Sequence, residues 1–358
     1  MKLKKKQDGI ILMITSFNQL YNFISFFLKK NLIKDKKIYL IIFSDQIPDT
    51  LIFNLKKYIE NYVSVEVIDL RREFNRSKIK FFQIKFLKII FYYYLVFKKI
   101  FELKQKTNIS FFSISGRMQI PVLCFMVLFS YSKFFLIEDG VGNYVPRNNY
   151  QKKQLSWIFL EYFLKINKSR IRILQLAEPG TKYHFILNQP FLKKEYLIDN
   201  RKNYTDLLKS LEKKLFFKPK CIIIATNPLQ STIDYYIKLY TKTVITLNKK
   251  YPFKPDEILF FFHPRTNSAY RNQLNNSLSD YVTIHPTSSF IVENYLSQEN
   301  LELVIGSLSS ALYYAKTIFK KNNVYHLDDN TSMHYENFVK VFDSVGVKKF
   351  FNSDIYNE

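Results

Sequence analysis

The chain has little of several features that define common protein classes. It contains two cysteines, Cys124 and Cys221, seven glycines and eleven prolines in 358 residues. Two distant cysteines, with no second thiol or histidine at metal-ligand spacing, exclude a disulfide framework and a zinc module. The small numbers of glycine and proline exclude a collagen-like or low-complexity chain. This cysteine usage is typical of a reducing compartment.

Long hydrophobic runs are also missing. The longest apolar stretch, residues 120–131, spans about a dozen residues, whereas a transmembrane helix needs about 20. Residues 1–6 are basic, but the apolar run at 10–14 is too short for a secretion signal. We therefore expect neither a membrane span nor a signal peptide.

Aromatic and basic residues, in contrast, are abundant. Hydrophobic residues make up 47% of the chain, and 35 Phe and 26 Tyr are among them. Such a chain can bury a core, which excludes intrinsic disorder, and its length suggests about two domains. The 54 Lys and Arg against 30 Asp and Glu give a net charge of +24. This surplus indicates an anionic partner or the codon bias of an AT-rich genome, and the sequence leaves both open.

Apolar runs alternate with longer amphipathic segments along the chain, which predicts an α/β protein with parallel sheets. We expect strands in the first half at residues 9–14, 37–43, 63–69, 109–114 and 133–137. In the second half we expect strands at 221–225, 258–262, 281–284, 301–305 and 324–327, with helices at 233–247 and 290–296. A charged segment with two prolines, residues 189–220, predicts a boundary near residue 215. The expected architecture is two Rossmann-like domains, 1–215 and 216–358, with the active site in the cleft between them.

The first candidate motif follows the strand expected at 133–137. Two adjacent carboxylates repel each other, which can raise one pKa and leave a base that takes a proton from a hydroxyl. Glycines in the following turn let the backbone approach a ligand. An acidic turn without a ligand is the alternative interpretation. The motif consists of Glu138, Asp139, Gly140, Gly142 and Asn143.

The second motif, His263-Pro264-Arg265, directly follows the strand expected at 258–262. His263 can donate a hydrogen bond or a proton to a leaving phosphate, and Arg265 adds a charge that can pair with an anion. Pro264 stiffens the turn. A solvated loop histidine is the alternative, because His285 also precedes a proline after an expected strand.

The third motif follows the strand expected at 301–305 and precedes a helix that reaches about residue 319. It contains Gly306, Ser307, Ser309 and Ser310. Hydroxyls and backbone N–H groups at a helix N-terminus can bind a phosphate. Plain N-capping by Ser307 or Ser309 is the alternative. The chain has neither a Gly-x-Gly-x-x-Gly nor a Walker-type motif, so hydride transfer and ATP hydrolysis lose their usual support.

Thr15 and Ser16 follow the first expected strand. Their position at a strand end suits contact with a donor sugar. Ser16 and Gln19 also have the spacing of a capping box, and capping alone is the alternative.

In this order, the motifs resemble the bacterial sialyltransferases of glycosyltransferase family 52, the lipooligosaccharide sialyltransferase group. The same elements mark the polysialyltransferases and the marine bacterial sialyltransferases. The resemblance spans most of the chain in order and is weak outside the motifs. The elements that carry it are Glu138-Asp139-Gly140 with its extension to residue 144, His263-Pro264-Arg265 and Ser309-Ser310.

The resemblance implies a GT-B architecture and an inverting, metal-independent transfer of sialic acid from CMP-sialic acid. The acceptor would be a hydroxyl of a lipooligosaccharide or capsule glycan, bound by the N-terminal domain, with the donor in the C-terminal domain. By this analogy Asp139, or alternatively Glu138, is the general base, and His263 stabilises or protonates the leaving CMP phosphate. Ser309 and Ser310 would hold that phosphate. No cofactor is implied, and the chain has no Asp-x-Asp triplet for a metal–nucleotide complex.

Glu293, on the helix expected at 290–296, falls where related enzymes place an acid that binds the nucleotide ribose or base. A glutamate on a surface helix is the alternative. Some members of the family carry an acid after the first strand of the second domain, whereas residues 226–230 contain none here. The base is therefore expected from Glu138 and Asp139.

Two basic segments indicate binding to an anionic membrane surface. Residues 71–100 contain nine basic residues against one acid, interleaved with nine aromatics, and residues 151–172 repeat the pattern around Trp157. A core-facing helix with a basic outer face is the alternative. We expect a cytoplasmic enzyme, peripheral on the inner face of the bacterial inner membrane, where lipid-linked glycans reside. The oligomeric state stays open, a homodimer included.

Other functions remain as alternatives. One is a related transferase with another nucleotide sugar, such as a glucosyl donor, and another is a polysialyltransferase that extends its own product. A nucleic-acid-binding protein would explain the charge and the aromatics. It ranks lowest because the basic residues form no recognition motif and because the three motifs follow strand ends.

Overall fold

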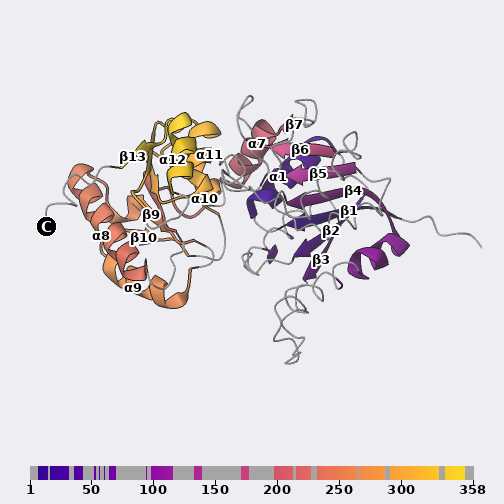
Figure 1. Cartoon of the computed structure of the whole chain (residues 1–358), viewed down its shortest axis with the longest axis horizontal. Helices are drawn as coiled ribbons and strands as arrows, with labels where there is room; N and C mark the ends of the chain where they lie inside the picture. Colours follow the sequence, from indigo (N-terminus) through magenta and orange to yellow (C-terminus); the bar gives the residue numbers. More distant parts are fainter. Residues whose placement is uncertain are drawn as a thin grey trace, which may run out of the picture. The chain divides into compact units, whose positions relative to one another are not determined.

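The computed structural model contains two compact units, each with its own parallel sheet (Figure 1). The division falls between Tyr204 and Thr205, inside helix α7 (Arg201–Glu212). The boundary expected near residue 215 lies just past the end of this helix. The structure describes residues 7–14, 17–31, 36–42, 52–53, 56, 60, 64–69, 94, 98–115, 133–138, 171–176, 197–212, 215–226, 232–263, 266–286, 291–329 and 335–350.

The first unit is built on a seven-stranded sheet in the order β3-β2-β1-β4-β5-β6-β7. All of its strand pairs are parallel. Because β2 lies on one side of β1 and β4 on the other, the strand order reverses there, and such a reversal opens a crevice at the carboxyl ends of the strands. The strands are β1 (Gln7–Ile14), β2 (Lys37–Ile42), β3 (Val65–Asp69), β4 (Thr107–Ser115), β5 (Lys133–Ile137), β6 (Ile171–Gln175) and β7 (Leu197–Asp199).

Helix α1 (Phe17–Lys29) packs against β1 and β5 of this sheet. Its buried face is aromatic because Phe residues recur at helical spacing. The rings of Phe23 and Phe27 stack at 4.1 Å, and Phe27 meets Phe135 of β5 edge-on at 5.0 Å. These contacts fix the strand that leads into the acidic motif.

The second unit is built on a six-stranded sheet in the order β10-β9-β8-β11-β12-β13, again parallel throughout. Its order reverses between β8 and β11. The strands are β8 (Cys221–Ile224), β9 (Ile258–Phe261), β10 (Thr283–Ile284), β11 (Leu303–Gly306), β12 (Asn323–His326) and β13 (Lys348–Lys349). The helices are α8 (Ile233–Lys250), η5 (Pro255–Glu257), α9 (Ser268–Leu278), α10 (Val292–Leu296), α11 (Ser310–Thr317) and α12 (Tyr335–Ser344).

Strands β8, β9 and β11 are buried along their whole length. A parallel strand covered on both faces needs apolar residues at every position, so it forms a continuous hydrophobic run in the sequence. Helix α8 covers this sheet with Tyr236, Tyr240, Val244 and Leu247 at helical spacing. The parallel α/β architecture expected from the sequence is confirmed.

Three short strands, β6, β7 and β13, were not expected from the sequence. Strands β7 and β13 have only three and two residues, too few for a hydrophobic period to show. Strand β6 overlaps the end of the second basic segment, so Arg172 lies on an inner strand of the sheet. Strand β10 is shorter than expected and begins at Thr283.

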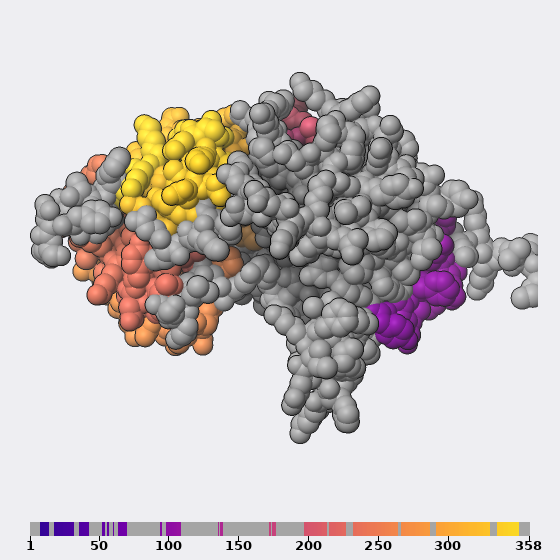
Figure 2. Space-filling view, in the orientation of Figure 1, coloured from indigo at the N-terminus to yellow at the C-terminus, as the bar shows by residue number. Residues whose placement is uncertain are grey.

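Among the described residues, no helix has the length and hydrophobicity needed to cross a bilayer. Of the first basic segment, the structure describes residues 94 and 98–100, and the helix there continues to residue 106. Figure 2 shows this helix, in purple, exposed on the face in view, and Phe101 is 55% exposed. The remainder of the first basic segment, and the second up to residue 170, lie outside the described residues.

Candidate functional site

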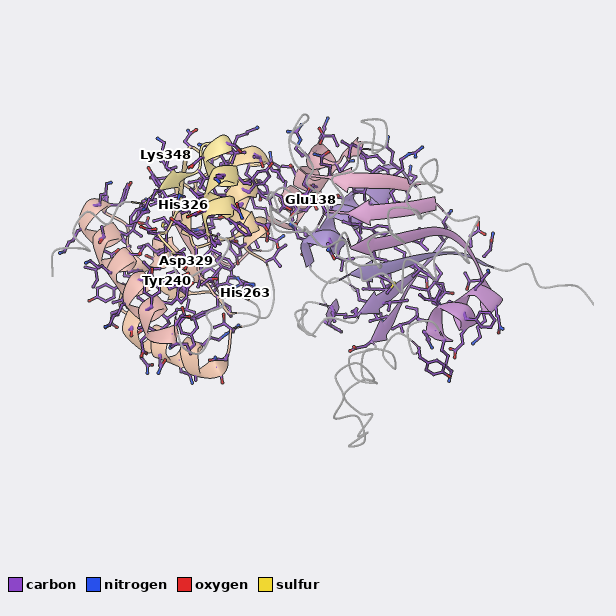
Figure 3. All side chains as sticks on the ribbon, viewed as in Figure 1. Glu138, Tyr240, His263, His326, Asp329 and Lys348 are labelled. Carbon is purple, nitrogen blue, oxygen red and sulfur yellow. The ribbon has the colours of Figure 1, made fainter. Side chains whose placement is uncertain are left out.

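The second unit brings several of the predicted residues to the carboxyl ends of its strands, and His263 is labelled in Figure 3. His263 lies beyond the end of β9, and Gly306 ends β11. Strand β8 lies between β9 and β11, so the ends of these two strands are about 10 Å apart, two strand spacings. One ligand the size of a nucleotide can span that distance.

The serine turn, residues 306–309, connects β11 to α11. Gly306 lies opposite Ile224 of β8, and a Cβ at position 306 would come within 3.0 Å of the Ile224 Cβ and carbonyl oxygen. This close approach favours glycine, because a side chain here would press against Ile224. Ser309 is the N-cap of α11, and its hydroxyl oxygen accepts a hydrogen bond from the Ala311 N–H at 3.2 Å. An accepting hydroxyl keeps its own proton, which it can donate to an anion at the positive end of the helix.

The two His-Pro dipeptides occupy different environments. His263 is half-buried, and its backbone oxygen accepts a hydrogen bond from the Thr266 N–H at 2.9 Å. His285 is buried, stacks on Phe261 at 4.4 Å, and places its Nε2 atom 3.1 Å from the Tyr295 hydroxyl. Burial lowers the pKa of His285 to about 4, so it is neutral at pH 7. His285 is thus part of the core, whereas His263 is partly accessible. Pro264 and Arg265 lie outside the described residues.

Glu293 is on the short helix α10, which packs against α11. Its side chain is 8% exposed, so the alternative of a solvated surface glutamate is wrong. Burial raises the pKa of this carboxyl to about 7. When ionised it is an acceptor for hydroxyl groups, and the ribose of a nucleotide carries two of them.

Glu293→Gln is expected to remove a pH dependence of stability. The folded chain holds the Glu293 proton up to about pH 7, whereas the unfolded chain loses it near 4.5, so wild-type stability falls as the pH rises between these values. At pH 8 the variant should be more stable, by about 3 kcal/mol, and well below pH 4.5, where the carboxyl is protonated in both states, the two should be equal. Thermal unfolding across this range measures the difference. Parallel stability curves for the two proteins would contradict the burial of an acid at this position.

In the first unit, Glu138 follows the end of β5 and is fully buried. Its backbone N–H donates to the Leu174 oxygen at 3.3 Å, and its Oε2 atom accepts a hydrogen bond from the Leu176 N–H at 2.6 Å. Asn22 of α1 donates to the same Leu174 oxygen at 3.3 Å. These bonds join the ends of β5 and β6 and engage one carboxylate oxygen of Glu138.

The structure leaves part of the predicted site undescribed. Gln19, the predicted partner of Ser16, is fully buried in α1, which begins directly after Ser16. The described residues contain no group of three His, Cys, Asp or Glu side chains that could hold a metal, and metal independence stays a prediction. Besides Pro264 and Arg265, the predicted site residues outside the described residues are Thr15, Ser16, Asp139, Gly140, Gly142 and Asn143.

Sequence reasoning missed two tyrosines on the buried face of α8. The Tyr240 hydroxyl accepts a hydrogen bond from the Thr226 N–H at 2.8 Å and lies 2.6 Å from the Ser307 Oγ atom. The Tyr236 hydroxyl donates to Asp329 Oδ1 at 2.7 Å. A signal was available, because a buried tyrosine needs a partner for its hydroxyl, and two of them one helical turn apart lie on the same face.

Comparison with known proteins adds a family and a fold. Residues 10–328 match the model of the family described as alpha-2,8-polysialyltransferase (POLYST). No curated protein sequence matches the chain. Among solved structures, a 2,6-sialyltransferase of Photobacterium sp. JT-ISH-224, in a ternary complex with CMP and lactose, is similar with a TM-score of 0.55 and 13% identity. That alignment covers 95% of this chain and 76% of the other.

Proteins with a different bound nucleotide share the fold. The UDP-GlcNAc 2-epimerase of Neisseria meningitidis, bound to UDP-GlcNAc, is similar with a TM-score of 0.53 and 11% identity over 97% of this chain and 87% of that one. MnaA of S. aureus, in a structure with UDP, is similar with a TM-score of 0.51 and 8% identity. That alignment covers 94% of this chain and 87% of the other. At these identities the likeness shows the fold alone and does not identify the donor.

Proposed function

Because the chain belongs to the alpha-2,8-polysialyltransferase family, we propose that it transfers sialic acid from CMP-sialic acid to a hydroxyl of a glycan. The chain is a sialyltransferase-like glycosyltransferase with the GT-B fold. The relation to the polysialyltransferases, whose elements the three motifs share, is thereby confirmed. Membership of family 52 and a role in lipooligosaccharide synthesis stay predictions.

The donor side of the proposal rests on the serine turn. The single observation that supports it most is Ser309 capping an eight-residue helix directly beyond β11, one of the two strands between which the sheet order reverses. The CMP phosphate would accept hydrogen bonds from Ser309, Ser310 and the start of α11. Glu293, on the neighbouring helix, would bind the ribose or base. Gly306 lets the start of the turn lie close to Ile224 at the end of β8.

The proposed reaction is one displacement with inversion. Asp139 takes the proton of the acceptor hydroxyl, and the resulting oxygen bonds to the anomeric carbon C2 of sialic acid. The bond between C2 and the CMP phosphate oxygen breaks, and its electron pair stays on the phosphate. His263 stabilises that charge or protonates the phosphate oxygen, and the charge of Arg265 stabilises it further, which together replace the metal of other transferases. Glu138, whose carboxylate binds the Leu176 N–H, would hold the turn that contains Asp139 and its glycines.

The two basic segments bear on which acceptor the enzyme uses. A lipid-linked glycan such as lipooligosaccharide or capsule is our first candidate, because the basic segments would place the enzyme at the cytoplasmic face of the inner membrane. Sedimentation with anionic liposomes tests this location. Binding that decreases with salt is expected, and its absence would contradict membrane docking.

A second candidate is repeated transfer, which extends a chain of sialic acid. The description of the matching family favours it. Lactose and a short α-2,8-linked sialic acid oligomer, offered side by side, distinguish the two candidates. Single transfer gives one product on lactose, whereas repeated transfer gives a ladder of products on the oligomer.

The test of the proposed function is CMP release from CMP-sialic acid, measured with both acceptors and compared with UDP-sugars. Release that depends on an acceptor and survives EDTA is expected. Release from a UDP-sugar but not from CMP-sialic acid would overturn the donor assignment. Activity abolished by EDTA and restored by a divalent ion would overturn metal independence.

A further inference from the structure

The Tyr240 hydroxyl forms hydrogen bonds with residues just after β8 and β11, the two strands between which the sheet order reverses. The Tyr240 Oη atom contacts the Thr226 N–H, just after β8, at 2.8 Å and the Ser307 Oγ atom, just after β11, at 2.6 Å. In open α/β sheets the reversal is where ligands bind, outside the carboxyl ends of these two strands. Tyr240 therefore lies at the base of the expected crevice, although it comes from a helix that packs on the sheet.

The Tyr240 oxygen is the acceptor in one of these two hydrogen bonds. The Thr226 N–H can only donate, so the Tyr240 oxygen accepts this bond and its own proton remains to be donated. Ser307 Oγ lies within reach of that proton at 2.6 Å, and either of the two hydroxyls can donate the bond between them. Burial raises the pKa of Tyr240 well above its usual value, which keeps this proton on the phenol at any working pH.

The ring of Tyr240 packs in the core and is fully buried. It stacks on the ring of Tyr236 with 6.2 Å between the ring centroids, and it contacts the ring of Phe260 in β9 edge-on with 5.5 Å between the centroids. Tyr236, one helical turn earlier, binds Asp329 just after β12. Helix α8 thus reaches three successive strand ends of the sheet through two tyrosine hydroxyls.

We propose that Tyr240 is a positioning residue for the nucleotide phosphate, because its hydroxyl fixes Ser307 and so sets the course of the serine turn into α11. This inference rests on the proposed function, since the turn is the proposed phosphate site. Ser307 precedes the N-cap Ser309 by two residues, and Ser307 is itself buried. A shift of Ser307 would move the Ser309 hydroxyl and the first N–H groups of the helix together.

The test compares the affinities for CMP and for cytidine, which differ only in the phosphate. Isothermal titration calorimetry gives both dissociation constants for the wild type and for Tyr240→Phe. We expect the ratio of the cytidine constant to the CMP constant to fall about tenfold in the variant, with cytidine binding almost unchanged. In steady-state assays the KM for CMP-sialic acid should rise more than kcat falls. A general loss of stability would weaken both ligands alike.

Tyr270→Phe is the matched control. Tyr270 is also fully buried in this core, and its hydroxyl has no hydrogen-bond partner among the residues that the structure describes. The control should keep the wild-type affinity ratio. Should Tyr240→Phe fail to fold, Ser307→Ala removes the same bond from the other side and should lower the ratio, and Ser307→Thr, which keeps the hydroxyl, should restore it.

Two results would overturn the inference in different ways. An unchanged ratio in Tyr240→Phe, or in Ser307→Ala where the tyrosine variant is unfolded, would show that the bond does not position the phosphate site, and the proposed function would stand. A wild type that binds CMP no better than cytidine would remove the phosphate site itself and, with it, the role of Tyr240.

Discussion

Asp139→Asn is expected to lower kcat by about a hundredfold to ten-thousandfold, the contribution typical of a general base. Asparagine has nearly the same size but cannot take the proton from the acceptor hydroxyl. The KM for CMP-sialic acid should change little, because the base acts on the acceptor. Initial rates of CMP release at saturating donor and acceptor measure the effect.

Glu138→Gln is the matched control, because it changes the neighbouring acid in the same way. Glu138 is fully buried with its Oε2 atom bound to the Leu176 N–H. The amide oxygen of glutamine can still accept that bond, although without the charge, so we expect a loss of about 1 kcal/mol in stability and a small change in kcat. The opposite pattern, with kcat lost in Glu138→Gln and kept in Asp139→Asn, would make Glu138 the base.

His263→Ala is expected to lower kcat by about a hundredfold to a thousandfold. Negative charge collects on the CMP phosphate as the bond to sialic acid breaks, and a donor at that oxygen stabilises the transition state more than the ground state. CMP-sialic acid binding should therefore weaken much less than kcat falls. Single-turnover rates, together with donor affinity, separate the two effects.

The second His-Pro dipeptide supplies the control for this prediction. His285 is buried between Phe261 and Tyr295, so His285→Gln should lower the melting temperature through lost packing. The folded fraction of this variant should keep the wild-type kcat. A kcat that stays unchanged in His263→Ala would remove the histidine from the mechanism.

Much of the fold was determined by the sequence alone. Strands β8, β9 and β11 are buried on both faces. Each is therefore a continuous apolar run in the sequence, which distinguishes it from a surface segment. A polar motif directly after such a run must lie at the carboxyl edge of the sheet. That rule was enough to place His263 and Gly306 at the edge where the structure has them.

The environment of each side chain was decided only by the tertiary structure. Two identical dipeptides follow strands β9 and β10, and only the packing of Phe261 and Tyr295 makes His285 part of the core while His263 is half-buried. Glu293 is buried on a helix of five residues whose sequence is compatible with a surface position. The short strands β7 and β13 form because neighbouring strands supply their hydrogen bonds.

The Tyr240–Ser307 bond joins residues 67 positions apart. Periodicity reports which face of an element is buried, because that depends on residues three or four positions away. It does not report which distant group meets a buried hydroxyl, because that depends on the order of the strands and on how α8 packs across them. The sequence by itself therefore determined the layers and the edge that bears the motifs, and the folded chain decided which polar groups there bind one another.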